Sequence, residues 1–201
     1  MPDFEYEKAA TESGFKYICG VDEAGRGPLA GPVCAAAVIL PENCDIEGLN
    51  DSKKLSEKKR EQLFDIIKEK AVAYSVAFGS LEEIEQLNIL EATYLAMNRA
   101  IEALSVKADF ALIDGNRVPK NIKIPCETIV KGDSKSMSVA AASVLAKVTR
   151  DRLLLEYDKK YPLYNFKKHK GYGTKEHTDL IKLYGPCEIH RLSFLKNILG
   201  K

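Results

Sequence analysis

The sequence has almost no net charge, because its 30 Lys and Arg residues are balanced by 29 Asp and Glu residues. Domains that bind nucleic acids often carry a clear positive excess, so the overall composition does not favour that class. Any such contact would have to come from local basic patches, and charge alone indicates only a solvated surface. Two patches are present: Lys53, Lys54, Lys58, Lys59 and Arg60, and Lys167, Lys168, His169 and Lys170.

The usual metal-binding patterns of cysteine and histidine are missing. The five cysteines include no C-x-x-C pair, which argues against a zinc ribbon or a thioredoxin-like redox site. Their odd number predicts reduced thiols and a reducing compartment. The three histidines form no H-x-x-x-H pair and have no cysteine at ligand spacing, so a zinc site is disfavoured.

Long apolar runs are absent as well. The longest, residues 33–40, is too short to cross a bilayer. The N-terminus, MPDFEYE, is acidic and has no apolar stretch of the kind found in signal peptides. We therefore expect a cytoplasmic protein with no membrane partner. Its 45% apolar and 29% charged residues are typical of a globular chain with a buried core.

What the sequence does contain is an ordered series of strand and helix patterns. Residues 80–83 (SLEE) form a capping box that opens a short helix. Apolar alternation or short apolar runs predict strands at residues 16–22, 33–40, 71–79, 109–114 and 122–130. Helical spacing or capping signals predict helices at residues 56–70, 89–104, 134–161 and 174–184, another after Pro186, and a short helix or arm at residues 1–15.

These elements predict an α/β fold in which a mixed, partly antiparallel sheet is flanked by helices. We expect one domain over residues 1–201, with a helical C-terminal part from about residue 160. The tail ends in an apolar pattern, Phe194-Leu195-x-x-Ile198-Leu199, which could contact a partner, although packing on the core is the favoured interpretation.

Four carboxylates stand at the ends of predicted strands, where α/β proteins tend to build their sites. Asp22 and Glu23 end the first strand, Asp114 ends the strand FALID, and Asp133 opens the long helix. Clustered carboxylates repel one another, and a divalent cation would relieve that repulsion. Oxygen ligands suit a hard ion, Mg²⁺ or Mn²⁺, and two such ions would suit phosphodiester hydrolysis.

Simpler interpretations of these acids stay open at this stage. Asp133 could be only a helix N-cap. Asp22 and Glu23 are neighbours, and neighbouring strand residues point to opposite faces, so the strand must end by Glu23 if both are to bind metal. Asp151 follows Asp133 by 18 residues on the predicted helix, about 27 Å along the axis, so we interpret Asp151 as structural or substrate-facing.

Five motifs, in order along the chain, resemble the signature blocks of the type two ribonuclease H family. The resemblance covers about residues 16–178, and its first block is specific on its own. The motifs are residues 20–33 (GVDEAGRGPLAGPV), 51–56 (DSKKLS), 112–116 (LIDGN), 131–134 (KGDS) followed by 140–151 (AAASVLAKVTRD), and 171–174 (GYGT).

The resemblance implies a ribonuclease H-like fold with a family-specific helical C-terminal part. It implies an endonuclease, expected to act as a monomer, that uses two Mn²⁺ or Mg²⁺ ions to cut RNA in RNA–DNA hybrids and at single ribonucleotides embedded in duplex DNA, leaving 3′-hydroxyl and 5′-phosphate ends. The implied metal-binding and catalytic quartet is Asp22, Glu23, Asp114 and Asp133.

The resemblance also implies which residues contact the substrate. The Gly25-Arg26-Gly27 turn would read the 2′-hydroxyl, the group that distinguishes RNA from DNA. Tyr172 would stack on the sugar of the next nucleotide and favour a deoxyribose there, although alone it could be an ordinary loop tyrosine. Lys53 and Ser134 are weaker candidates for phosphate contacts.

Three rival interpretations remain. Gly25, Gly27 and Gly31 suggest a dinucleotide fingerprint, but their spacing is wrong and they precede a strand. A non-catalytic nucleic-acid-binding module is disfavoured because unneutralised carboxylates repel phosphate. The closest rival is the type three ribonuclease H family, which usually has an additional N-terminal domain and a lysine in place of Arg26. The presence of Arg26 therefore favours type two.

Overall fold

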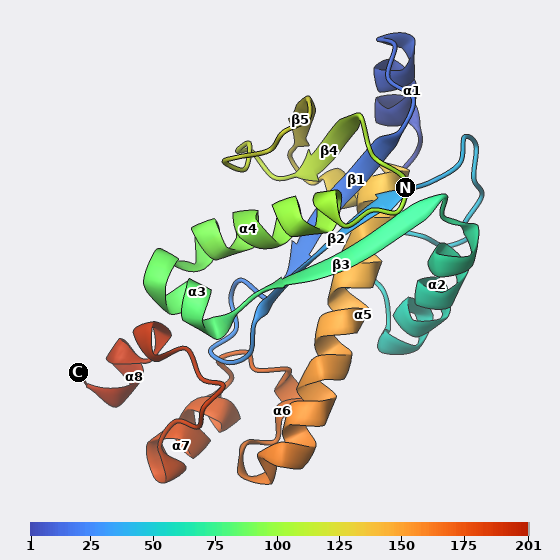
Figure 1. Ribbon diagram of the computed structural model, residues 1–201. Coiled ribbons are helices and arrows are strands. Elements are labelled where there is room, and N and C mark those ends of the chain that lie inside the picture. The colour runs from blue at the N-terminus through green and yellow to red at the C-terminus, as the bar shows by residue number, and fades with distance from the viewer. Residues whose placement is uncertain (201) are drawn as a thin grey trace.

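The computed structural model describes residues 1–200, which form a mixed sheet with helices on both faces (Figure 1). Its strands are β1 (Ile18–Ala24), β2 (Val33–Ile39), β3 (Ala73–Gly79), β4 (Phe110–Asp114) and β5 (Cys126–Ile129). The order across the sheet is β3-β2-β1-β4-β5. β1 pairs antiparallel with β2, and β2 with β3, whereas β1 with β4 and β4 with β5 are parallel. The predicted partly antiparallel α/β sheet is confirmed.

Several helices and 3₁₀ turns surround this sheet. The α-helices are α1 (Glu5–Glu12), α2 (Glu57–Lys70), α3 (Leu81–Leu87), α4 (Ile89–Glu102), α5 (Met137–Lys160), α6 (Phe166–His169), α7 (Lys175–Tyr184) and α8 (Lys196–Leu199). The 3₁₀ turns are η1 (Ser52–Lys54), η2 (Gly132–Ser134), η3 (Pro162–Tyr164) and η4 (Leu192–Phe194). The described residues include no helix with the length and apolar character needed to cross a membrane.

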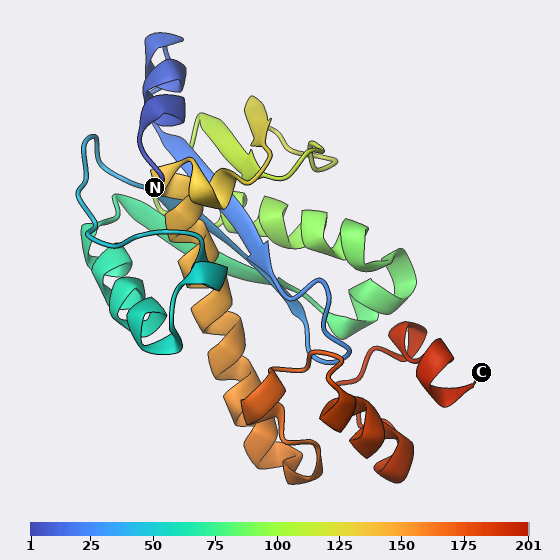
Figure 2. The same cartoon turned by 180° about the vertical axis from the view of Figure 1, so that it is seen from behind.

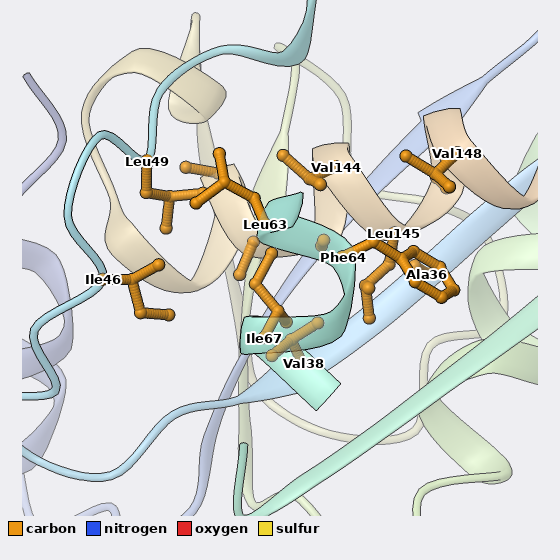
Figure 3. Close-up of a cluster of buried hydrophobic side chains, with 14 of the residues drawn as sticks. Ala36, Val38, Ile46, Leu49, Leu63, Phe64, Ile67, Val144, Leu145 and Val148 are labelled. Carbon is orange, nitrogen blue, oxygen red and sulfur yellow. The ribbon is translucent and has the colours of Figure 1, made fainter. Parts of the chain in front are cut away.

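The interior strand β2 is buried on both faces, and its side chains alternate between two cores. Ala36 and Val38 join the cluster under α5 and α2, whereas Ala35 and Ala37 join the cluster under α4. The two views of the ribbon show α4 and α5 on opposite faces of the sheet (Figures 1 and 2). The first cluster gathers aliphatic side chains of α2, α5 and β2 (Figure 3). Each large aliphatic side chain buried there stabilises the fold by roughly 1.5–3 kcal/mol.

Small residues let α5 lie directly against β1. A Cβ atom built on Gly20 would lie 2.1 Å from the carbonyl carbon of Ser138, so any larger residue would push the helix away. The alanines at residues 140–142 are completely buried on the same helix. This close packing fixes the N-terminal end of α5 beside Gly20, two residues before Asp22 on β1.

The C-terminal helices pack around a separate apolar cluster that contains Leu154, Phe166, Ile181 and Leu195. Ile198 and Leu199 are partly buried against it, and Phe194 packs on a neighbouring cluster. The prediction that the apolar tail packs on the core is therefore confirmed. The expected helix after Pro186 is divided into η4 and α8.

Two predicted boundaries are wrong in ways that affect the site. β1 continues to Ala24, so Glu23 lies inside the strand rather than beyond its end. The long helix begins at Met137, and Ser136 is its N-cap, accepting a hydrogen bond from the N–H of Val139. Asp133 lies in the preceding 3₁₀ turn, and the interpretation of this residue as the helix N-cap is excluded.

Candidate active site

Three carboxylates from separate stretches of the chain meet at one edge of the sheet. β1 and β4 are neighbouring parallel strands paired through Val21 and Ile113, so the next residues, Asp22 and Asp114, stand side by side. The 3₁₀ turn η2 brings Asp133 to the same edge. One carboxylate oxygen from each of Asp22, Asp114 and Asp133 lies within 4.8 Å of the others.

This cluster is buried and carries like charges, and both facts affect its ionisation. Asp22 is 2% exposed, and burial, followed by the negative charges of Glu23 and Asp114, raises its pKa well above its usual range. Burial and the negative charge of Asp114 likewise raise the pKa of Asp133. In the ionised state the three carboxylates therefore repel one another in a region of low dielectric.

Backbone N–H groups and hydroxyls orient the acids within the cluster. The N–H of Glu23 donates to Oδ1 of Asp22 at 2.7 Å, and the N–H of Gly132 donates to Oδ1 of Asp114 at 2.7 Å. The Ser143 hydroxyl, which also contacts the Ser52 hydroxyl at 2.9 Å, acts on Asp22 as a hydrogen-bond partner that lowers its pKa. These contacts leave the other carboxylate oxygens available for a cation.

Glu23 faces away from this group, as the alternation of a strand requires. Its side chain lines a cavity of about 330 Å³ on the α4 side of the sheet, together with Arg26, Thr93 and Asp114. An Arg26 nitrogen lies 3.5 Å from Oε1 of Glu23. Burial and the charge of Asp114 raise the pKa of Glu23, opposed by the charge of Arg26. Glu23 thus shares this cavity with Asp114, while its charge also acts on the adjacent Asp22.

Asp114 also borders a second cavity of about 370 Å³ on the other side, lined by Asp133, Lys53 and Ser134. The Lys53 ammonium lies 3.6 Å from Oδ2 of Asp133 while its side chain stays 74% exposed. Burial, which lowers the pKa of Lys53, is outweighed by the surrounding carboxylates, so the pKa is raised. The Ser134 hydroxyl donates to the carbonyl of Lys131 at 2.9 Å. Both cavities therefore open onto the same carboxylate.

The Gly25-Arg26-Gly27 turn lies beside this edge, and two buried arginines contact it from the protein interior. Arg191 donates to the carbonyls of Gly25 at 2.6 Å, Arg26 at 3.0 Å and Gly31 at 2.7 Å. Arg150 donates to the carbonyls of Ala30, Pro32 and Lys170. A Cβ atom on Gly25, whose φ is +101°, would lie 2.0 Å from Nε of Arg150, so only glycine fits there.

Tyr172 stands next to the same turn. A Cβ atom built on Gly27 would lie 3.9 Å from Cε1 of Tyr172, and the N–H of Leu29 donates to the carbonyl of Gly171 at 2.8 Å. The ring is 42% exposed, and the Lys147 ammonium lies 5.6 Å from its centre. An exposed ring beside a backbone turn provides a flat surface on which a nucleotide can stack.

The donor set fits a hard divalent cation. The three converging ligand groups are all carboxylates, two of them buried, and their repulsion is the condition that a bound cation relieves. Asp151, which was predicted not to join this site, instead lies 2.8 Å from the Lys147 ammonium and 4.0 Å from the Arg60 guanidinium.

Comparisons with known proteins agree with this geometry. The family model of Ribonuclease HII matches residues 19–197. A ribonuclease HII of Caldicellulosiruptor bescii is 57% identical over 98% of this chain and 95% of the relative. The chain belongs to the ribonuclease HII family. Ribonucleases of this family are metal-dependent hydrolases of phosphodiester bonds, and this chain is therefore an enzyme.

Solved structures of ribonucleases H have the same fold. The ribonuclease H2 of Pyrococcus horikoshii OT3 superposes with a TM-score of 0.76 at 27% identity, covering 92% of this chain and 98% of that one. The type three ribonuclease Bst-RNase HIII, crystallised with Mn²⁺, superposes with a TM-score of 0.70 at 18% identity, covering 92% of this chain and 69% of that one. The match to the ribonuclease HII family decides between the two types. The dinucleotide interpretation is wrong, because the glycine turn leads into antiparallel β2.

Sequence reasoning about this ribonuclease HII missed the groups that hold the turn. Arg150 and Arg191 are 1% and 0% exposed, yet in the sequence they stand among polar residues, where arginines are usually solvated. The second cavity also contains Asp51 and Lys131, which belong to two of the five motifs but were given no role from the sequence. Lys131 adopts a left-handed conformation with φ of +59°, which leads directly into η2 and Asp133.

Proposed function

We propose that this ribonuclease HII cuts RNA in RNA–DNA hybrids and at single ribonucleotides embedded in duplex DNA, leaving 3′-hydroxyl and 5′-phosphate ends. The observation that carries the proposal is the convergence of Asp22, Asp114 and Asp133 within 4.8 Å, beside an exposed glycine turn. Carboxylates alone would repel a phosphate, so this arrangement makes chemical sense only with divalent cations.

In this proposal Asp22, Asp114 and Asp133 would hold one Mg²⁺ or Mn²⁺ ion, and Glu23 with Asp114 would contribute to holding a second. Asp114 suits the shared position because it borders both cavities. Bound divalent ions supply activation of the attacking water and stabilisation of the leaving 3′ oxygen. The salt bridge from Arg26 keeps the Glu23 carboxylate at the end of β1 beside Asp114.

Recognition of ribose falls to the glycine turn. Its carbonyls at Gly25 and Arg26 already accept hydrogen bonds from Arg191, so the turn is rigid before substrate binds. Backbone groups of the turn then contact the 2′-hydroxyl without reading the base. Tyr172 stacks on the sugar of the following nucleotide, and Lys53 and Ser134 contact the phosphates flanking the cut.

Cleavage of a DNA duplex that contains one ribonucleotide tests the proposal. The wild-type enzyme should cut it in Mg²⁺ or Mn²⁺, on the 5′ side of the ribonucleotide, and should not cut it in EDTA. An all-DNA duplex of the same sequence is the substrate control. Asp65→Asn, which removes an exposed carboxylate on α2, is the protein control and should cut normally. Metal-independent cleavage, or cleavage of the all-DNA duplex, would contradict the proposal.

A further inference from the structure

Three buried histidines lie behind the Tyr172 loop, outside the acid cluster. His177 and His190 are 0% and 4% exposed, and His169 is also buried. Nε2 of His177 lies 3.0 Å from Nε2 of His190, and the rings of His169 and His177 stack with their centres 4.2 Å apart. Buried histidines without carboxylate partners are stable only when each ring nitrogen has a hydrogen-bond partner of the right kind.

The backbone fixes which nitrogen of each ring carries the proton. The N–H of Cys187 donates to Nδ1 of His190 at 2.9 Å, so this nitrogen is an acceptor and the proton of His190 is on Nε2. His190 Nε2–H therefore donates to Nε2 of His177. The proton of His177 is then on Nδ1, which donates to the carbonyl of Tyr172 at 2.9 Å.

The hydrogen bonds at both ends of this series, at Cys187 and at Tyr172, require the same order of donors and acceptors. Reversing it would point a protonated Nδ1 of His190 at the N–H of Cys187, and would leave Nδ1 of His177 as an acceptor facing the Tyr172 carbonyl. Protonating His177 would place two N–H groups against each other across the contact of 3.0 Å, and protonating His190 would place a protonated Nδ1 against the N–H of Cys187. The chain therefore exists only with His177 and His190 neutral, and burial keeps them so by lowering their pKa values.

The chain ends on the residue beside the glycine turn. The carbonyl of Tyr172 accepts from His177 and from the N–H of Thr174 at 2.8 Å, while its own N–H donates to the carbonyl of His169 at 2.9 Å. The ring of His169 is held in turn, because its Nδ1 accepts from the N–H of Gly171 and its Nε2 contacts the carbonyl of Tyr164. The backbone N–H and carbonyl of Tyr172 are thus both hydrogen-bonded, while its ring is exposed.

We propose that His177, whose tautomer is fixed by the hydrogen bond from His190, is a positioning residue that holds Tyr172 against the Gly25–Gly27 turn and thereby sets the preference for a deoxyribose after the ribonucleotide. The inference rests on the proposed function, because it takes Tyr172 as the stacking surface. It concerns side chains far from the carboxylate cluster in sequence, and it assigns them a role in selectivity rather than in the chemical step.

Two substitutions at one position separate positioning from simple packing. In His177→Asn the amide nitrogen replaces Nδ1 and can still donate to the Tyr172 carbonyl, although His190 loses its acceptor. In His177→Gln the amide oxygen replaces Nε2 and can still accept from His190, but the donor to Tyr172 is lost. Both variants lose one buried hydrogen bond, so their melting temperatures should fall by similar amounts.

The measurement is the ratio of kcat/KM on a duplex with one embedded ribonucleotide to kcat/KM on a uniform RNA–DNA hybrid. His177→Gln should lower this ratio about tenfold, and His177→Asn should restore it to near the wild-type value. Ile181→Val, which loosens the packing of the same helix without touching the chain, is the stability control and should leave the ratio unchanged. In a Tyr172→Ala background His177→Gln should have no further effect on the ratio.

Nuclear magnetic resonance of the histidine ring nitrogens tests the chain without activity. At neutral pH we expect His177 in its Nδ1–H form and His190 in its Nε2–H form, both neutral. Finding His177 in its Nε2–H form, or equal ratios in the Gln and Asn variants, would overturn the positioning role while leaving the nuclease assignment in place. A wild-type enzyme that cuts neither substrate would overturn both.

Discussion

The acid cluster at the end of β1 and the histidine-arginine region behind the glycine turn are both buried and polar, but they are stabilised in opposite ways. At the cluster, Asp22, Asp114 and Asp133 repel one another, and the pKa of Asp22 is raised well above its usual range. Behind the turn, Arg191 donates to backbone carbonyls and His177 is neutral with both ring nitrogens paired. In the first region the unfavourable charge is confined to the carboxylates proposed to bind metal, whereas the second region is held by hydrogen bonds.

Removing one cluster carboxylate should have the largest effect. Asp22→Asn should abolish cleavage, a loss of roughly 10³-fold or more, because a metal ligand is lost. In metal-free buffer the same variant should melt at a higher temperature than the wild type, because the neutral amide relieves repulsion. Steady-state cleavage measures the loss of activity, and thermal melting in EDTA measures the gain in stability. Full activity in folded Asp22→Asn would refute the metal-site assignment.

Removing a supporting arginine should have the opposite effect on stability. Arg191→Met leaves the carbonyls of Gly25, Arg26 and Gly31 without a buried donor, which should destabilise the fold by roughly 3 kcal/mol or more. Urea unfolding measures this loss. Arg152→Met, which removes an exposed arginine of α5, is the matched control and should change stability by less than about 1 kcal/mol. Equal stability of both variants would contradict the supporting role of Arg191.

Acid should destabilise the histidine region. Burial lowers the pKa of His177 and of His190 to about 4, whereas in the unfolded chain the pKa of each is near 6.5. Well above pH 6.5 both histidines are neutral in the folded and in the unfolded chain, so their contribution to stability is constant. As the pH falls from 6.5 towards 4 the unfolded state binds more protons, so stability decreases.

The expected loss by pH 4 is roughly 3 kcal/mol for each histidine, about 6 kcal/mol for the pair, or about 10–25 °C in melting temperature. His177→Asn should reduce the decrease by about half, which thermal melts between pH 7 and pH 4 would measure. Neighbouring titratable and charged groups, which are the same in the wild type and in this variant, are Asp158, Tyr164, Lys168, His169, Glu176 and Cys187. A decrease in His177→Asn as steep as in the wild type would contradict the neutral chain.

The stacking surface should contribute less than the carboxylates to activity. Tyr172→Ala should reduce cleavage of a duplex with one ribonucleotide by about 10- to 100-fold, since stacking on an aromatic ring is worth roughly 1–3 kcal/mol. Its affinity for the same duplex in EDTA should change less, because phosphate contacts supply most of the binding. Equal losses of cleavage and binding would count against stacking at the junction.

The smallest effect is expected from the basic patch at the site. Binding should weaken as salt increases, and Lys53→Gln should reduce the slope of log affinity against log salt by about one. Fluorescence anisotropy in EDTA measures both slopes. Lys58→Gln on the exposed side of α2 is the comparison variant. A flat salt response, or the same slope in Lys53→Gln as in the wild type, would exclude docking through Lys53.

Local patterns were sufficient to predict much of the fold. A near-continuous apolar run located β2, and apolar alternation located β3. Helical spacing located α2, and capping signals at Ser80 and Thr174 located the starts of α3 and α7. The end of β1 was predicted one or two residues too early, because Asp22 and Glu23 are acidic and look like the end of an apolar run. Pairing with β2 extends the strand to Ala24, and a pairing partner is not visible in the local sequence.

The site was predicted in part. Asp22, Asp114 and Asp133 do meet, but their meeting depends on β1 and β4 being parallel neighbours, which no single segment determines. The family resemblance supplied that information. It treated Glu23 as equivalent to the others, whereas the strand directs Glu23 to the opposite side of Asp114. The buried Arg191 could not be recognised, because burial of a polar side chain is decided by contacts distant in sequence.

Thermal melting with added Mn²⁺ tests the central claim most directly, since an ion that binds only the folded state raises its stability. The account predicts that Mn²⁺ raises the melting temperature of the wild-type protein in a concentration-dependent way, and leaves Asp22→Asn and Asp114→Asn nearly unchanged. A wild-type melting temperature that does not respond to Mn²⁺, or an equal rise in the wild type and both variants, would contradict a divalent-metal site formed by these carboxylates.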